Sequence, residues 1–370
     1  MTSMSVPQAE SRYASWVLRL LLSADAVADG LGALDWDVLL RVARANRVLV
    51  RTAQRLAAGA IAVPERFAAA VAGERRRIQA TLALMQRVSR ACQARHIAFL
   101  FPKAFQDYPD FGDDVDLLVL TRSTRVDGGI IEGLPASPVP RDWGERIAGA
   151  VTYRVTGCPS PLDVQHGRLG IVGEHDAFPQ VLIEHARVTV VAGIEFAEPP
   201  PEDQLVLQGM QRVAGRLRIA LCDVVFTVST LRRATLDWDY VIATARQHGA
   251  LPGLGCYLSY VDQVHHDVFG QPLLADAVSR SLMLRGWGQI EFRKGGYRFP
   301  IVRANSRLYW RQFRQRIARG DWTGAARLCL TPVVAGARAV RWLAGRVRAA
   351  VRPRGDRERT EPLAEAGVTE

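Results

Sequence analysis

The stretch FLFPKAFQDYPDFGDDVDLLVL, residues 99–120, marks a change in the character of this chain of 370 residues. Before it, apolar residues recur at steps of three and four, which predicts helices over residues 11–22, 35–56 and 65–94. At residue 97 the pattern becomes a short apolar run in HIAFLF, whose length and composition are those of a buried strand. The chain therefore passes from helices into a sheet.

Strand-like segments continue beyond this point, and turn-forming residues separate them. We expect strands at residues 115–120, 151–156 and 162–165, a hairpin at 187–191 and 194–196, and a loop at ASPVPRDW that leads into a short helix at 144–150. After EPPPED, helical periodicity returns at residues 204–231 and 238–248, with Pro201 and Asp203 as start signals.

The order of these segments predicts an α+β protein in which a small mixed sheet is flanked by two helical regions. We divide the chain into an N-terminal helical region (1–94), an α/β core (95–200), a basic C-terminal helical region (201–352) and a disordered tail (353–370). Two similar segments, LDWDVLLRVAR at residues 34–44 and LDWDYVIATAR at 236–246, each predict a helix start capped by an Asp.

Composition and apolar segments bear on the compartment. The cysteines lack the paired spacing of a disulfide framework or a zinc site, so we expect reduced thiols at Cys92, Cys158, Cys222, Cys256 and Cys329. The N-terminus has no signal-peptide pattern, and the apolar stretches 219–231 and 328–340 are too short, or carry Arg338, to span a bilayer. We expect a cytoplasmic protein.

The acidic residues of the DVD segment suggest a metal site. Asp114 and Asp116 occupy alternate positions of a strand, so both carboxylates lie on one sheet face, where they repel each other unless a cation lies between them. Asp163 lies between apolar neighbours on a later predicted strand and completes the site if the strands are adjacent. Hard oxygen ligands favour Mg²⁺ or Mn²⁺. The alternative interpretation of this pattern is a solvated strand end.

Lysine is rare in this chain, although the net charge is +11. Nearly all of the positive charge is arginine, and Lys103 and Lys294 are the only lysines. Lys103 follows the first predicted strand, where a compact ammonium could contact phosphate oxygens. The alternative is a surface lysine beside Asp107 or Asp110.

A family resemblance rests on these motifs. Lys103, YPD at residues 108–110, DVDLLV at 114–119, LDVQHGRL at 162–169 and the helices after PPPED resemble a bacterial nucleotidyltransferase-like family of uncharacterised proteins associated with polysaccharide-assembly loci. That family belongs to the minimal nucleotidyltransferase, or polymerase-beta-like, superfamily. The likeness covers about residues 30 to 270.

The resemblance implies transfer of a nucleoside monophosphate from a nucleoside triphosphate to an acceptor hydroxyl, with two metal ions. Asp114 and Asp116 would bind both metals, Asp163 would bind the metal next to the acceptor and help remove its proton, and Lys103 would bind the nucleotide. One departure stands out: Pro102-Lys103-Ala104 replaces the Gly-Ser that holds phosphates in the superfamily. The alternative function is a binding or scaffold protein that kept the fold without turnover.

The C-terminal region carries a basic aromatic pattern. Between residues 303 and 354 acidic residues almost vanish, while arginines accumulate around aromatic residues: Arg307, Arg311, Arg314, Arg316, Arg319, Arg341, Arg346 and Arg348 around Tyr309, Trp310, Phe313, Trp322 and Trp342. Such a surface fits an anionic membrane, an acidic partner or a solvated helical cap. Nucleic acid is disfavoured because no recognition motif accompanies the charge.

The histidines are less informative. His166 and Arg168 follow the third Asp, and the sequence gives neither a role. His265 and His266 have no Cys or Glu at ligand spacing, so we expect both on the surface.

Overall fold

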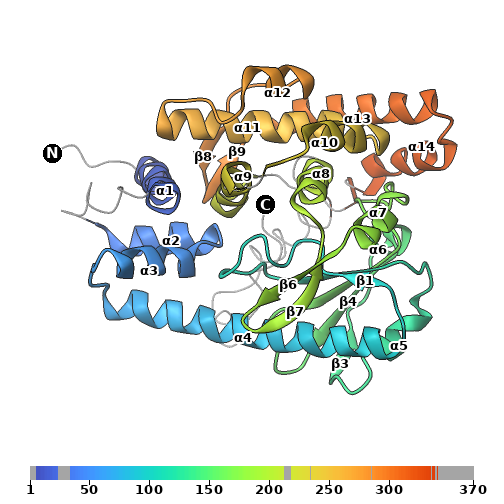
Figure 1. Ribbon diagram of the computed structural model, residues 1–370, viewed down its shortest axis with the longest axis horizontal. Coiled ribbons are helices and arrows are strands. Elements are labelled where there is room, and N and C mark those ends of the chain that lie inside the picture. Colours follow the sequence, from blue (N-terminus) through green and yellow to red (C-terminus); the bar gives the residue numbers. More distant parts are fainter. Residues whose placement is uncertain are drawn as a thin grey trace.

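The computed structural model of the protein describes residues 6–23, 34–211, 218–233, 235–284, 286–334, 336–337 and 340. The predicted tail at 353–370 and the basic residues Arg341, Trp342, Arg346 and Arg348 lie outside this part of the chain. The protein belongs to the α+β class, with one mixed sheet and helices before and after it in the chain (Figure 1).

The N-terminal region forms four helices, α1 (Val6–Leu22), α2 (Trp36–Ala45), α3 (Leu49–Ala58) and α4 (Glu65–Ala94). The single helix predicted over residues 35–56 was wrong, because the chain breaks between α2 and α3. Asn46 is fully buried there, and its side chain donates to the carbonyl oxygens of Val42 and Gly295 and accepts from Leu221 N. Arg47 then takes a positive φ of 54°. The spacing of apolar residues cannot predict this helix end, because a buried polar side chain causes it.

The central sheet has five strands in the order β1-β2-β5-β4-β3. They are β1 (Phe99–Leu100), β2 (Val115–Val119), β3 (Ala136–Pro138), β4 (Ala150–Val155) and β5 (Leu162–His166). Strands β2 and β5 are parallel, and every other pairing is antiparallel. Short helical segments connect them: η2 (Thr124–Val126), α5 (Asp127–Ile130) and α6 (Trp143–Ala148).

Two parts of the sheet differ from the prediction. The first residues of ASPVPRDW form the edge strand β3, which we had assigned to a loop; an edge position tolerates Pro138 because one side of the strand needs no backbone donor. Strand β1 is only two residues long, although six apolar or aromatic residues suggested more. It stops before Pro102, which has no N–H for the ladder.

The two faces of the sheet meet different partners. In Figure 1, α4 runs along one side of the sheet and the C-terminal helices lie on the other. Val115, Leu117 and Val119 of β2 share a buried cluster with α4 residues that include Leu82 and Met85. Alternation along β2 and β5 therefore turns Asp116 and Asp163 toward the opposite face.

The chain after the sheet is mainly helical. Its elements are α7 (Phe178–Glu184), the hairpin β6 (Arg187–Val191) and β7 (Ile194–Glu198), α8 (Pro201–Gln211), α9 (Leu221–Arg233), α10 (Trp238–Gln247), α11 (Leu251–Phe269), α12 (Asp276–Ser281), the hairpin β8 (Glu291–Arg293) and β9 (Gly296–Arg298), α13 (Ile301–Ala318) and α14 (Trp322–Leu328).

The N-terminal and C-terminal helices share one core. Leu18 of α1 and Leu39 of α2 belong to the same buried cluster as Leu258 and Val261 of α11. Helices α8 and α11 approach each other closely, because a Cβ on Gly253 would lie 2.3 Å from the carbonyl oxygen of Gly209. The helical regions that precede and follow the sheet in the chain therefore pack together in space.

The two similar LDWD segments begin helices as predicted. The Asp35 carboxylate accepts from Asp37 N and Val38 N at the start of α2, and Asp237 accepts from Tyr240 N at the start of α10. These caps satisfy backbone donors that the first turn leaves without partners. Within the described part of the chain, no helix combines the length and apolarity that a membrane crossing requires.

Candidate metal centre

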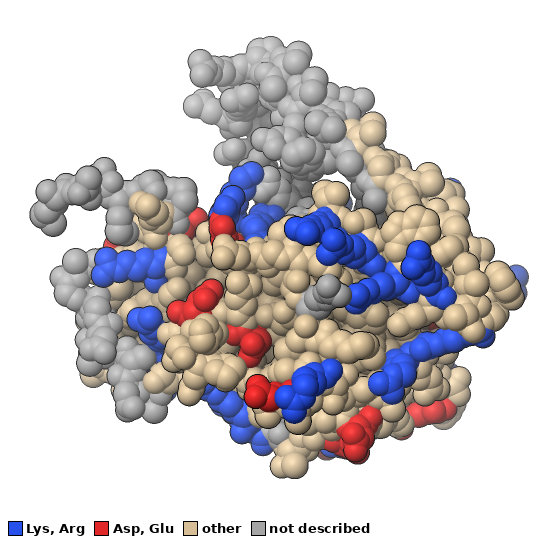
Figure 2. Space-filling model, turned by 90° about the horizontal axis from the view of Figure 1, so that it is seen from above, with Lys and Arg blue, Asp and Glu red and all other residues tan. Residues whose placement is uncertain are grey.

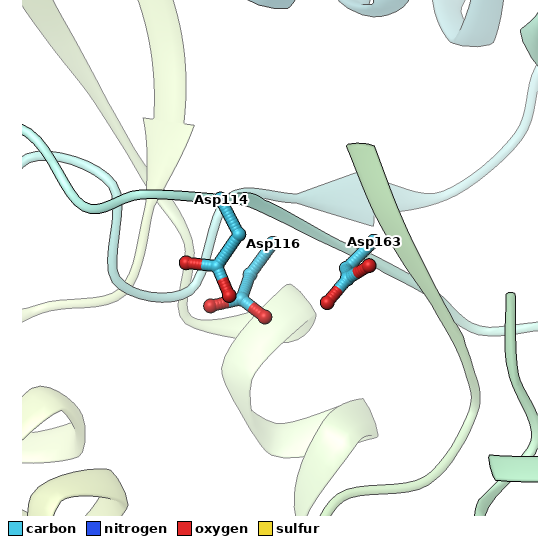
Figure 3. Close-up of side chains that lie close together, drawn as sticks. All are labelled: Asp114, Asp116 and Asp163. Atoms are coloured by element: carbon cyan, nitrogen blue, oxygen red, sulfur yellow. The ribbon is translucent and has the colours of Figure 1, made fainter. Parts of the chain in front are cut away.

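Three carboxylates meet at the edge where β2 and β5 run side by side. Asp116 lies directly opposite Asp163 in the parallel register, and Asp114 precedes β2 by one residue. Each of the three offers an oxygen within 4.8 Å of the others, and all three are partly buried. Figure 3 shows the side chains pointing into the same space, Asp163 from the neighbouring strand. The acid cluster expected from sequence is therefore assembled in the structure.

Asp116 lies at the centre of the polar contacts. Lys103 Nζ lies 2.8 Å from Asp116 Oδ2, and Gln165 Nε2 donates to Asp116 Oδ1 at 2.8 Å. Both Lys103 and Asp116 side chains are mostly buried, with exposed fractions of 15% and 11%. Lys103 thus pairs with the acid cluster, and neither Asp107 nor Asp110 is its partner as the alternative interpretation required.

Asp163 is only partly compensated. Burial, together with the charges of Asp116 and Asp114, raises the pKa of this carboxyl from 3.8 to about 6, against a hydrogen bond from Thr152 that lowers it. Asp163 Oδ1 is buried and has no hydrogen-bond partner among the described residues. A buried acceptor without a donor is costly, and a cation at this point would satisfy it.

The donor set fits a hard divalent cation. All three side chains offer carboxylate oxygens, which Mg²⁺, Mn²⁺ and Ca²⁺ prefer, and no sulfur or imidazole ligand from the described residues joins the cluster. The ligands come from adjacent strands of one sheet, so the backbone hydrogen bonds hold their spacing. Asp114, Asp116 and Asp163 would be the ligands of such an ion.

Two pockets lie near the cluster, and Lys103 lines both. The first lies toward the α2–α3 turn and is lined by Arg47, Asp107, Gly112, Asp114 and Asp116 with Ala104. The second, of about 300 Å³, lies toward the C-terminal helices. Its size is at the lower end of small-molecule sites. Lys103 is therefore shared by two spaces, one of which Asp114 and Asp116 also line.

The loop that leads to Asp114 is fixed by charge. The Asp110 carboxylate accepts from Val50 N at 2.8 Å and from Arg51 N at 3.1 Å, so it caps the first turn of α3 from a distant loop. Arg51 Nε adds an ion pair at 3.1 Å. Asp113 of the same loop pairs with Arg47, which lies between α2 and α3, at 2.8 Å. The buried contacts of Asp110 hold the start of β2 against the N-terminal helices, whereas the Asp113 side chain is exposed.

Some residues, at the cluster and elsewhere, were missed or misassigned from sequence. Gln165 and Thr152 contact the carboxylates, yet single polar residues on strands give no motif. His265 was expected on the surface but is 2% exposed, and its ring contacts Arg232 and the carbonyl oxygen of Gln271; His266 is exposed as expected. Arg316, expected in the basic surface, is buried and pairs with Asp321.

In comparisons with protein-family models, curated proteins and solved structures, no match to the chain was found. The family resemblance therefore rests on the sequence motifs, and function must be argued from the site.

Proposed function

We propose that the protein is a metal-dependent nucleotidyltransferase that transfers a nucleoside monophosphate from a nucleoside triphosphate to an acceptor hydroxyl. The observation that supports it is the meeting of Asp114, Asp116 and Asp163 within 4.8 Å on adjacent strands, with an unpartnered buried oxygen on Asp163. Carboxylates in this arrangement hold the cations that phosphoryl-type transfer needs. The sequence motifs point to the same class.

In the reaction, the acceptor oxygen attacks the α-phosphorus and forms a new O–P bond, while the bond to the β-phosphate oxygen breaks and pyrophosphate leaves. Asp114, Asp116 and Asp163 would hold divalent ions, which would neutralise charge on the phosphates and favour loss of the acceptor hydroxyl proton. Asp163 accepts the hydroxyl proton. The Lys103 ammonium contacts phosphate oxygens and takes over part of the role of the Gly-Ser loop that this chain lacks.

The direct test is nucleotide transfer with a panel of triphosphates in Mg²⁺ or Mn²⁺, comparing the wild type with Asp116→Asn. We expect metal-dependent release of pyrophosphate that falls about a thousandfold in the variant, since several kcal/mol of transition-state stabilisation depend on the metal. The matched control is Asp113→Asn, whose side chain is 60% exposed and outside the cluster. Equal activity in wild type and Asp116→Asn would end the enzymatic proposal.

A second candidate is a binding or scaffold protein without turnover. The observation that favours it is the Lys103–Asp116 contact, because an ammonium already neutralises one ligand of the cluster. Pro102-Lys103-Ala104 also limits how closely the backbone can approach a phosphate. Calorimetry separates the two: a scaffold binds triphosphate and metal stoichiometrically but releases no pyrophosphate over hours.

We also propose that the protein contacts anionic membrane surfaces through α13. Arg303, Arg307, Arg311 and Arg314 are exposed on this helix, and Trp310 among them is 57% exposed. Figure 2 shows Lys and Arg side chains spread over the face that carries the upper helices of Figure 1. An interface of arginine and tryptophan suits anionic headgroups and the apolar boundary beneath them.

Vesicle flotation tests this contact. We expect salt-sensitive binding to phosphatidylglycerol vesicles, none to phosphatidylcholine vesicles, and loss of binding when the four arginines are changed to Gln. The control changes Arg75 and Arg76 of α4, which are equally exposed. Absence of binding at low salt removes the membrane proposal.

A further inference from the structure

The larger pocket beside the cluster lies where β5 ends. Gln165 of β5 and Lys103 line it on the side of the cluster, and Arg168 lines it just beyond the strand. Ile171 and Met210 supply apolar wall. This pocket adjoins β4 and β5, the strands that carry Ala150 and Asp163, whereas the smaller pocket adjoins Asp114 and Arg47. The larger pocket is therefore on the side of Asp163.

Positive charge gathers around the loop that follows β5. Arg327 donates to the carbonyl oxygen of Gly173 at 2.7 Å, and Arg122, which pairs with Asp176 at 3.2 Å, passes close to Gly167. Arg168 Nε is buried and has no hydrogen-bond partner among the described residues. The guanidinium of Arg168 thus has like-charged neighbours and an unused donor, which an anion in the pocket would satisfy.

The loop itself is held in a fixed shape. Gly167, Gly170 and Gly173 all have positive φ, and a Cβ at Gly170 would lie 2.2 Å from the Glu174 carboxylate. Glu174 is buried and accepts from Val172 N at 3.0 Å, so its charge is engaged by the loop backbone. The carboxylate nearest the pocket is therefore already bonded, and Arg168 is presented by a rigid loop.

We propose that Arg168 binds a phosphate group of the acceptor, so that the acceptor is a phosphorylated small molecule such as a sugar phosphate. This inference rests on the proposed function, in which Asp163 takes the proton of the acceptor hydroxyl. The phosphate pairs with the Arg168 guanidinium, the apolar wall contacts the carbon skeleton, and a free hydroxyl extends past Gln165 toward Asp163.

The experiment is calorimetric binding to the full chain in EDTA, so that no metal contributes. The probes are inorganic phosphate, glucose 1-phosphate and glucose. We expect the wild type to bind both phosphates and not glucose, Arg168→Gln to weaken that binding at least tenfold, and Arg168→Lys to lose less. Arg125→Gln, an exposed arginine away from the pocket, serves as the matched control and should bind as the wild type.

The outcomes separate the sources of the phosphate. If wild type and folded Arg168→Gln bind the phosphates equally, or if the wild type binds neither, the inference is overturned. If Arg168→Gln instead weakens Mg²⁺-dependent ATP binding and spares the sugar phosphate, the pocket serves the triphosphate, and the acceptor assignment is wrong. Because binding in EDTA needs no turnover, failure of the transferase proposal leaves this measurement readable.

Discussion

Strand β5 carries two polar sites, one on each face, and they differ in how completely they are satisfied. On one face Asp163 joins Asp114 and Asp116, and its Oδ1 has no hydrogen-bond partner in the described chain. On the other face His166 lies 2.7 Å from Asp127 through Nε2 and 2.8 Å from the carbonyl oxygen of Gly149 through Nδ1. One strand thus presents an incomplete and a complete polar site.

The buried site around His166 is complete within itself. Both ring nitrogens lie within hydrogen-bond distance of an oxygen atom, Nδ1 of the Gly149 carbonyl and Nε2 of the Asp127 carboxylate, so each has a partner. Tyr153 OH donates to the second Asp127 oxygen at 2.7 Å. All three side chains are buried. A network in which every group has a partner stabilises the fold and offers a ligand no unpartnered group to bind.

The partners of each polar group distinguish a structural polar cluster from a functional one. Burial and charge are common to both faces, so neither identifies function. What differs is the partnering of the carboxylates: on the His166 face one carboxylate meets a ring nitrogen and a hydroxyl, whereas the Asp163 face gathers three carboxylates, one of which contacts the Lys103 ammonium. An unbalanced cluster is tolerated where a ligand completes it.

The largest effect is expected from Asp127→Ala, which breaks the complete face. It leaves the His166 ring without its carboxylate partner and Tyr153 without its acceptor, so we expect a loss of about 4 kcal/mol in the free energy of unfolding, because two buried groups lose their partners. Denaturant titration measures it. Asp113→Ala, an exposed carboxylate, should cost far less. A loss below about 1 kcal/mol for Asp127→Ala would contradict the buried network.

The next effect is metal stabilisation of the incomplete face. At a concentration one hundred times its dissociation constant, Mn²⁺ should stabilise the wild type by about 2.7 kcal/mol, because it binds the folded cluster only. Thermal unfolding with and without Mn²⁺ measures this. Asp116→Asn should lose the gain and Asp113→Asn should keep it. A gain retained in Asp116→Asn would place the ion elsewhere.

In the metal-free protein, Asp163 should make the free energy of unfolding depend on pH. Because the pKa of Asp163 is raised from 3.8 to about 6, the folded protein holds this proton at a pH where the unfolded chain has lost it. Stability from this group therefore falls as pH rises from about 4 to about 6 and stays low above that range. Asp163→Asn should be more stable than wild type by about 2 kcal/mol at pH 7 in EDTA, and equal to it near pH 3. A variant less stable at pH 7 would show that the carboxylate is already compensated.

The smallest effect is expected from Lys103→Met. Removing the ammonium 2.8 Å from Asp116 Oδ2 frees that oxygen and removes a like charge from the incoming cation. We expect Mn²⁺ affinity to rise about tenfold, or 1.4 kcal/mol, while triphosphate affinity falls. Calorimetry with each ligand measures both. Unchanged Mn²⁺ affinity would mean that the Lys103 side chain moves away from Asp116 when the cation binds.

Much of the fold could be predicted from periodicity. The bounds of α4 were predicted as Glu65–Ala94, and β2 and β5 were predicted within one residue, because apolar alternation and helical spacing are local signals. The α2–α3 break and β3 could not be predicted, since Asn46 acts through partners far along the chain and β3 is a short edge strand.

The candidate site divides in the same way. Asp114 and Asp116 share a face by alternation alone, but the position of Asp163 beside Asp116 depends on which strands pair, and sequence offered that only as a condition. The roles of Gln165 and Arg168 depend on the rotamers and loop geometry of an irregular segment with three left-handed glycines. Such features are properties of the assembled tertiary structure.

The parallel pairing of β2 with β5 has a consequence for how the cation site is made. The segment between the two strands contains α5, β3, α6 and β4. Asp163 therefore comes to lie beside Asp116 only when β5 pairs with β2 across this long intervening segment. A nascent or truncated chain that ends before β5 holds the DVD pair without its third ligand. In the proposed function, cation binding would therefore require the finished sheet, and a chain that ends before β5 should bind Mn²⁺ more weakly than the full chain.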